Sequence, residues 1–207
     1  MTGIIILAAG SSSRLGQPKQ LVPWQGIPLI RHAAITAIEA NLGPIAIVLG
    51  AIVEPCRDAL QGLDLIITEN PAWESGMGSS IACGMASLTS HDLENVIVTL
   101  CDLPLITPAV FGKLLALRLS EKTEVIASHN GNTHAPPILF SKNRFSLLES
   151  LTGPEGARSL LRDETSITPM DCPESNADID TPDDLVKAKS QKTQKQPGEI
   201  GNKGEPD

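Results

Sequence analysis

Apolar residues in this chain gather in short, almost unbroken runs that are separated by longer segments of mixed polarity. Four such runs, rich in isoleucine, valine and leucine, occupy residues 3–10, 44–50, 63–70 and 95–102. Strands that are apolar on both faces are typical of parallel sheets covered by helices on both sides. The pattern therefore predicts four buried parallel strands.

The segments between these runs have the length and periodicity of helices. We predict helices at residues 28–40, 54–61 and 78–87. In the first of them, Pro28 stands at the start, where its missing N–H is harmless. The apolar stripe expected on that helix consists of Leu29, Ala33, Ile35 and Ile38. Strands that alternate with helices in this way indicate right-handed βαβ units, and hence an α/β fold.

The second half of the chain continues with a different order of elements. A helix is predicted at residues 108–120, followed by two strands that flank a polar turn and add an antiparallel pair, at 124–128 and 136–141. Two further helices are predicted at 155–163 and 182–189. We expect residues 1–189 to form a single domain. Residues 190–207 contain one aliphatic residue, too little to offset the entropy of ordering, which predicts a disordered tail.

Charge and cysteine usage exclude several classes of protein. The 16 basic and 24 acidic residues give a net charge of −8, which argues against binding nucleic acid by phosphate neutralisation, although local basic residues can hold one small anion. The four cysteines lack C-x-x-C spacing and no apolar leader opens the chain, so a disulfide framework, a zinc site and a secretory signal are not expected. No apolar run approaches the roughly 20 residues that span a bilayer. We expect a soluble, cytoplasmic protein.

The stretch LAAGSSSRLGQPK, residues 7–19, follows the first predicted strand, where ligands of open α/β sheets bind. Its glycine and serines let backbone N–H groups approach an anion closely, which favours phosphate. The P-loop and dinucleotide-binding patterns are both absent. Arg14 and Lys19 can reach different oxygens of a polyphosphate, which suits a leaving pyrophosphate. The alternative is an ordinary strand-to-helix connection in which both side chains are merely solvated.

Taken whole, this stretch resembles the signature L-A-[AG]-G-x-[SG]-x-R-[ML]-G-x-x-K of the MobA-like nucleotidyltransferases. Four later segments are similar to phrases of the molybdenum cofactor cytidylyltransferases: GMGSSIACGM (76–85), CDLPLITP (101–108), GPEGARSLL (153–161) and DIDTPDDL (178–185). Their order and spacing agree from about residue 3 to residue 188. The resemblance implies a Rossmann-like three-layer sandwich of the nucleotidyltransferase type, with a mostly parallel sheet.

The resemblance also implies a reaction, the transfer of CMP from CTP to the phosphate of molybdenum cofactor with release of pyrophosphate. Arg14, Lys19 and Asp102 would be its catalytic residues. CTP is favoured because the opening phrase has Ala9, as in cytidylyltransferases, where guanylyltransferases have glycine. A molybdoenzyme or its chaperone is the implied protein partner. The implied nucleotide-binding residues are Leu7, Ala8, Ala9, Gly10, Ser11, Ser12, Ser13, Arg14, Lys19, Gly78, Ser79 and Ser80.

Carboxylates supply the predicted metal site. Asp102 ends an apolar run, so its carboxylate should face the same crevice as the opening loop, and Mg²⁺ takes one or two carboxylates together with phosphate and water. Asp178 and Asp180 are candidates for the second carboxylate, because their spacing places both on one face of an extended segment. The resemblance selects Asp180 as the metal ligand. The alternative is that Asp180 or Thr181 caps the helix that follows.

The acceptor side departs most from the family pattern. Where the family has G-H-P, this chain has NTHAPP, so that His134 lies one residue early. His134 and Asp178 are candidates for contact with the substrate, the alternative for His134 being a hairpin histidine without a role. Cys101 and Leu103 replace the family's glycine and glutamine beside Asp102. Two other functions stay open: a nucleotidyltransferase for another phosphorylated acceptor, and a carrier or chaperone of the cofactor without turnover.

Overall fold

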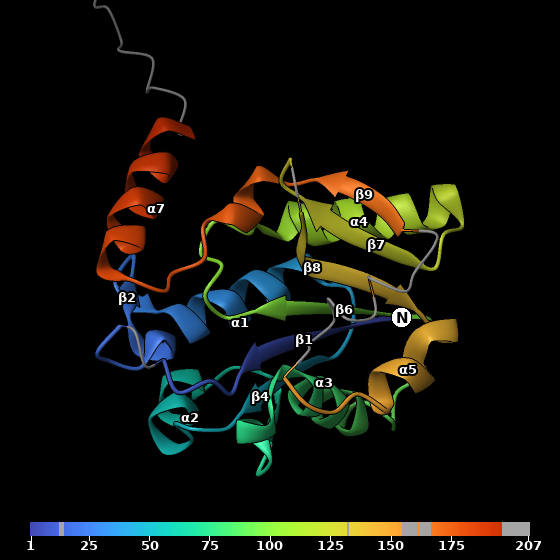
Figure 1. Ribbon diagram of the computed structural model, residues 1–207, viewed down its shortest axis with the longest axis horizontal. Coiled ribbons are helices and arrows are strands. Elements are labelled where there is room, and N and C mark those ends of the chain that lie inside the picture. The colour runs from blue at the N-terminus through green and yellow to red at the C-terminus, as the bar shows by residue number, and fades with distance from the viewer. Residues whose placement is uncertain (13–14, 132, 155–160, 162–166, 196–207) are drawn as a thin grey trace, which may run out of the picture.

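The computed structural model of the chain describes residues 1–12, 15–131, 133–154, 161 and 167–195. Its centre is a seven-stranded sheet in the order β5-β4-β1-β6-β8-β7-β9 (Figure 1). Strand β8 is antiparallel to both of its neighbours, and all other pairs are parallel. The predicted α/β fold and the antiparallel pair are confirmed. The strands are β1 (Thr2–Ala8), β4 (Ile45–Leu49), β5 (Ile66–Glu69), β6 (Asn95–Leu100), β7 (Val125–His129), β8 (His134–Ser141) and β9 (Ile167–Asp171).

Helices cover both faces of the sheet, which gives three layers (Figure 1). They are α1 (Leu29–Ala40), α2 (Glu54–Leu60), α3 (Met77–Ser87), α4 (Pro108–Glu121), α5 (Phe145–Glu149) and α7 (Pro182–Lys195). Ile4 and Ile6 of β1 point into a core shared with α1, α2 and α4, whereas Ile5 and Leu7 point into a second core with α3 and α5. Alternate residues of a strand face opposite sides, so β1 must be apolar throughout. Among the described helices, none is both long enough and apolar enough to span a membrane.

Helix α1 turns a different face to the core than its sequence pattern suggests. Ile30 and Ala34 are fully buried, whereas Ile38 is 37% exposed. Of the predicted stripe, Leu29 is fully buried and Ala33 packs against the core, Ile35 is half-buried, and the prediction is wrong for Ile38. This helix has apolar residues on most of its circumference, and its small alanines allow the closest approach to the strands.

The last helix is longer than predicted. Helix α7 continues to Lys195, so the predicted helix end at residue 189 is wrong. Ala188 is buried in a cluster with Trp24 and Ile179, and the ammonium of Lys192 lies 5.9 Å from the centre of the Trp24 ring. Together with Leu185, which packs against the same cluster, these contacts anchor a largely polar helix. Residues 196–207 of the predicted tail lie outside the described residues.

The segment before α7 contains a strand that the sequence did not predict. Edge strand β9 was not expected from the sequence, because ITPMD contains a proline and shows no alternation of apolar and polar residues. It pairs in parallel with β7 and extends the sheet by one strand. The helix predicted at 155–163 lies, except for Leu161, outside the described residues.

Candidate active site

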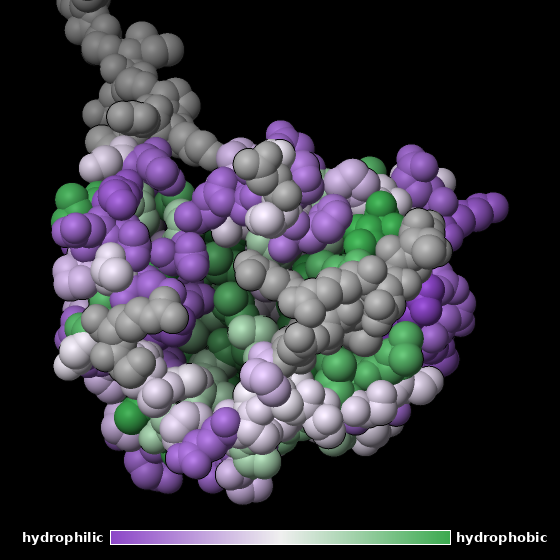
Figure 2. All heavy atoms as spheres, in the orientation of Figure 1, coloured by the Kyte–Doolittle hydropathy of each residue, from purple (hydrophilic) through white to green (hydrophobic). Residues whose placement is uncertain are grey.

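The carboxyl ends of β1 and β6 meet the start of α3 at a cavity with a volume of about 310 Å³. Ligands of open α/β sheets bind outside the carboxyl ends of the strands, where the strand order changes direction, and β1 is that strand, between β4 and β6. Figure 2 shows the surface hollowed over this end of the sheet, with apolar residues on the floor and polar residues along one rim. The lining consists of residues 7–11, Lys19, Gln20, Trp73, Glu74, Gly76, Met77, Ser80 and residues 100–102.

Gln20, to which the sequence analysis gives no role, ties the opening loop together. Its side chain is fully buried, and its amide nitrogen donates to the carbonyl oxygens of Ala8 at 2.9 Å and Gly10 at 2.6 Å. Its amide oxygen accepts from the hydroxyl of Ser12 at 3.2 Å, and the backbone N–H of Lys19 donates to that hydroxyl at 3.0 Å. These hydrogen bonds hold residues 8–12 against residues 19 and 20. The available sequence signal is a polar residue directly after the predicted phosphate-binding lysine.

Lys19 joins the two predicted metal ligands. Its ammonium forms an ion pair with Asp102 and donates to Oδ1 of Asp180 at 3.1 Å. Burial lowers the pKa of Lys19, but the charge of Asp102 and the hydrogen bonds to both carboxylates more than offset it, so the pKa is raised above its ordinary value. Lys19 is therefore a cation at every physiological pH, and it faces the cavity.

Asp102 and Asp180 are brought together by a backbone contact. The N–H of Ile179 donates to the backbone carbonyl oxygen of Asp102 at 3.1 Å, which fixes the segment that carries Asp180. The side chain of Asp102 is 5% exposed, and its Oδ1 is buried with no hydrogen-bond partner among the described residues. An unpartnered buried carboxylate oxygen suits a hard cation. The pair therefore fits Mg²⁺.

The remaining ligands of such an ion would come from outside the protein. In the part of the chain that the structure describes, no three or more His, Cys, Asp or Glu side chains gather as a metal site. Mg²⁺ commonly keeps several waters and binds substrate phosphates, with only one or two carboxylates from the protein. Two carboxylates at the edge of a phosphate-sized cavity are enough for that arrangement.

The segment from Asp178 to Asp184 shows which residue caps the following helix and which one lies beside Lys19. The hydroxyl oxygen of Thr181 accepts from the N–H of Asp184 at 3.3 Å, and Oδ2 of Asp184 accepts from the N–H and the hydroxyl of Thr181 at 2.9 and 2.7 Å. Thr181 therefore caps α7, while Asp180 contacts Lys19. Asp178 lies at the surface beside them, and burial of part of its carboxyl group, then the charge of Asp102, raises its pKa.

At the start of α3, one of the three predicted nucleotide-binding residues lines the cavity, namely Ser80. Ser79 binds Asn70 at 2.8 Å and also contacts backbone carbonyls. A Cβ on Gly78 would lie 2.9 Å from the backbone oxygen of Thr152, so glycine allows α3 to pack closely there. Asn70, which the sequence analysis missed, is buried and also donates to the hydroxyl of Ser80 at 3.0 Å. Asn70 is the last residue of the apolar run at 63–70, and no motif in the sequence marks it as functional.

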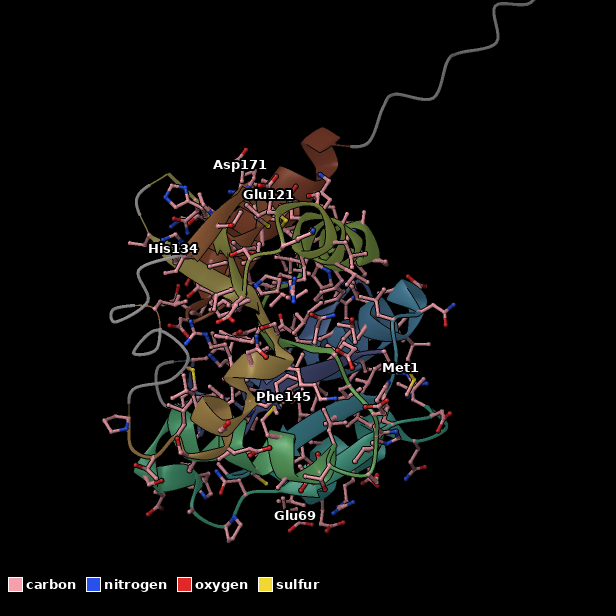
Figure 3. All side chains as sticks on the ribbon, turned by 90° about the vertical axis from the view of Figure 1, so that its right-hand side faces the viewer. Met1, Glu69, Glu121, His134, Phe145 and Asp171 are labelled. Atoms are coloured by element: carbon pink, nitrogen blue, oxygen red, sulfur yellow. The ribbon has the colours of Figure 1, made fainter. Side chains whose placement is uncertain are left out.

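His134 does not line this cavity but lies on the other half of the same sheet edge. It begins β8 and pairs with His129 at the end of β7, with the ring centres 5.4 Å apart. His129 also pairs with Asp171 at the end of β9, so that His134 and Asp171, both labelled in Figure 3, lie at the same end of the sheet. Partial burial, and then the charge of His129, lowers the pKa of His134. His134 is therefore neutral at pH 7.

The residues that depart from the family pattern beside Asp102 are largely core residues. Leu103 is 5% exposed and packs in the core beneath α1 and α4. Cys101 belongs to the same core and reaches the floor of the cavity, where burial raises the pKa of its thiol and keeps it protonated. The predicted residues Ser13 and Arg14 lie outside the described residues.

The fold and this site define a nucleotide-binding type of α/β protein, with a phosphate-sized cavity, a fixed cation and two carboxylates at the carboxyl ends of parallel strands. Residues 4–168 match the MobA-like NTP transferase domain. The chain therefore belongs to this family of nucleotidyltransferases. Among solved structures, the Rv0371c protein of Mycobacterium tuberculosis superposes with a TM-score of 0.74 at 26% identity, covering 90% of this chain and 96% of that one.

Curated relatives of similar length carry several names. The chain is 29% identical to the nicotine blue oxidoreductase of Paenarthrobacter nicotinovorans, over 90% of this chain and 95% of that protein. It is 28% identical to the molybdenum cofactor cytidylyltransferase of Escherichia coli K12, over 92% and 96%. It is 27% identical to the molybdenum cofactor guanylyltransferase of Rhodobacter capsulatus, over 93% and 97%. The names of these three relatives state three different activities.

Proposed function

We propose that this protein is a Mg²⁺-dependent cytidylyltransferase that transfers CMP from CTP to the phosphate of molybdenum cofactor and releases pyrophosphate. The observation that carries this proposal is the group formed by Lys19, Asp102 and Asp180 at the edge of the cavity. A fixed cation beside two carboxylates suits a metal-bound triphosphate that loses pyrophosphate. Ala9 in the opening phrase and the similarity to a cytidylyltransferase support CTP as the nucleotide.

In the proposed reaction, an oxygen of the acceptor phosphate attacks the α-phosphorus of CTP. The bond between that phosphorus and the bridging oxygen of pyrophosphate breaks, and pyrophosphate leaves with the electron pair. Positioning and electrostatic stabilisation suffice for such a transfer, so no covalent intermediate on the protein is required.

Each part of the site has a place in this scheme. Lys19 is permanently charged and compensates the negative charge that develops on the leaving pyrophosphate. Arg14 stays a predicted second cation for the same charge. The backbone N–H groups of the loop that follows β1 would hold the phosphates. Mg²⁺ held by Asp102 and Asp180 would neutralise the triphosphate charge when bound.

In this proposal the acceptor binds on the side of β8. A neutral imidazole can both donate and accept a hydrogen bond, so His134 suits contact with either the phosphate or the pterin of the cofactor. Asp178 lies at the surface beside Asp102 and is the second candidate. A molybdoenzyme or its chaperone would receive the product.

Pyrophosphate release from CTP, GTP, ATP and UTP with Mg²⁺, with and without molybdenum cofactor, tests the proposal. We expect release only with CTP and cofactor together. Release with GTP would show that Ala9 does not determine which base the protein selects. Binding of CTP without release would point to another phosphorylated acceptor, and binding of finished cofactor without any turnover would point to a carrier.

A further inference from the structure

Gln20 is completely buried and yet belongs to the lining of the cavity. The reaction scheme gives it no part. We propose that Gln20 is a positioning residue for the loop at residues 9–12, here called the triphosphate loop. Its side-chain amide sets the direction in which the backbone N–H groups of that loop point. The inference rests on the proposed function only in that a triphosphate binds in this cavity. It depends neither on the base nor on the acceptor.

The first support is the geometry of the peptide group. A trans peptide is planar, and its C=O and the N–H of the next residue point in opposite directions. The amide nitrogen of Gln20 binds the carbonyl oxygens of Ala8 and Gly10, which turns the N–H groups of Ala9 and Ser11 away from it. Ala9 and Ser11 both line the cavity. In the proposed arrangement, these two N–H groups bind the anion.

The second support is that no other kind of side chain can make these contacts. Two carbonyl acceptors and one hydroxyl donor require a group with two N–H donors and one acceptor, which a side-chain amide provides. Ser12, the residue that completes the set, has a φ of 57° and accepts from the backbone N–H of Lys19. Through Ser12, Gln20 therefore also fixes the backbone of Lys19, whose side chain carries the ammonium. An apolar residue of similar volume would fill the space and leave both carbonyls free to rotate.

The test is the affinity of the whole protein for CTP with Mg²⁺, measured by calorimetry, in the variant Gln20→Met. Methionine has nearly the same length and no polar hydrogen. We expect the dissociation constant to rise about ten- to hundred-fold, because buried carbonyls lose their donors and the loop loses its fixed shape. In turnover experiments, the KM for CTP should rise while the KM for the acceptor stays unchanged.

Asn95 provides the matched control. It is also a buried amide, and it donates to the hydroxyl of Thr2 at 3.4 Å at the opposite end of β1 and β6. Asn95→Leu should lower the midpoint of thermal unfolding to a similar extent and leave CTP affinity unchanged. A merely structural role for Gln20 predicts that the two variants behave alike in both measurements.

A second pair of variants guards against a failure of Gln20→Met to fold. Gln20→Glu keeps size and polarity but replaces both donors by acceptors, and Asn95→Asp makes the same exchange in the control. We expect Gln20→Glu to bind CTP more weakly than Gln20→Met. A folded Gln20 variant that binds CTP as tightly as the native protein would overturn the inference and leave the proposed function standing.

The panel of four nucleotides separates the two proposals in the other direction. If the native protein prefers another triphosphate and Gln20→Met weakens that one, the choice of CTP fails and the role of Gln20 stands. If the native protein binds no triphosphate, both fail.

Discussion

The two halves of the catalytic sheet edge differ in how completely their polar groups are paired. Beside β1, the amide of Gln20 and the ammonium of Lys19 each hold fixed partners in a largely buried setting, and the buried oxygen left without a partner among the described residues is Oδ1 of Asp102, which the proposed Mg²⁺ would contact. Beside β7 and β8, His129 and His134 pack ring against ring, and Nδ1 of His134 is buried without a partner among the described residues. A preorganised site stabilises developing charge without further rearrangement. The half proposed to bind the nucleotide is largely built in this way, and the half proposed to bind the acceptor would be completed by its ligand.

The largest effect that would test this contrast is expected from Asp102→Asn. The variant keeps the volume of the side chain and removes the charge that pairs with Lys19 and would hold Mg²⁺. Pyrophosphate release should fall by about 10³-fold, while circular dichroism shows an intact fold. Asp171→Asn makes the same exchange on the acceptor half and should lower turnover only slightly. Metal-dependent activity that survives in Asp102→Asn would remove Asp102 from the site.

Lys19→Gln should have the next largest effect and act in two directions. Loss of the fixed cation should lower pyrophosphate release by about 10²-fold. The same loss removes the charge that competes with a divalent ion for Asp102 and Asp180. Binding of Mn²⁺ without nucleotide, followed by electron paramagnetic resonance, should therefore become roughly tenfold tighter. Unchanged Mn²⁺ affinity would mean that the ion binds elsewhere.

On the acceptor half, His134→Ala should raise the KM for the acceptor by about three- to tenfold, the worth of one hydrogen bond, and leave the KM for CTP unchanged. Because the pKa of His134 is lowered from 6.5, its charged form appears only at acid pH. The KM for the acceptor should therefore be flat between pH 7 and pH 8, and should change only as the pH falls below 6. An equal rise in both KM values would place His134 outside the acceptor site.

The smallest effect concerns the cap that holds Asp180 in place. Thr181→Ala removes the hydroxyl that caps α7 and should lower the free energy of unfolding by about 1 kcal/mol. For a chain of this size that corresponds to a fall of about 2–4 °C in the melting temperature. Ser190→Ala, an exposed serine within the same helix, is the control and should change little. Equal effects of the two variants would argue against the cap.

Much of the parallel sheet could be predicted from the sequence because burial on both faces leaves a clear trace. The four aliphatic runs correspond to β1, β4, β5 and β6, and the cavity lies at the carboxyl ends of β1 and β6, beside the loop with the expected small residues. Lys19, Asp102 and Asp180 also come together as their motifs predict. In each case a local pattern determines the position.

The rest depends on contacts that no local pattern reveals. Edge strand β9 lacks alternation and forms because β7 offers it a free side, not because of its own composition. Gln20 and Asn70 are polar residues without a motif, and their importance comes from which backbone carbonyls and hydroxyls fold around them. The face that α1 buries carries Leu29, Ile30, Ala34, Thr36 and Ala37, and its direction depends on packing against the sheet rather than on the apolar pattern alone.

The contact between Lys19 and Asp180 joins positions 161 residues apart, and that between Lys19 and Asp102 joins positions 83 apart. Contacts of such long sequence separation form late, because most of the chain must be ordered before its ends meet. A chain emerging from the ribosome thus holds the triphosphate loop long before it holds Asp180. The last thirty residues decide when the pair of carboxylates is complete, so a nascent or truncated chain can present the loop without the carboxylate of Asp180.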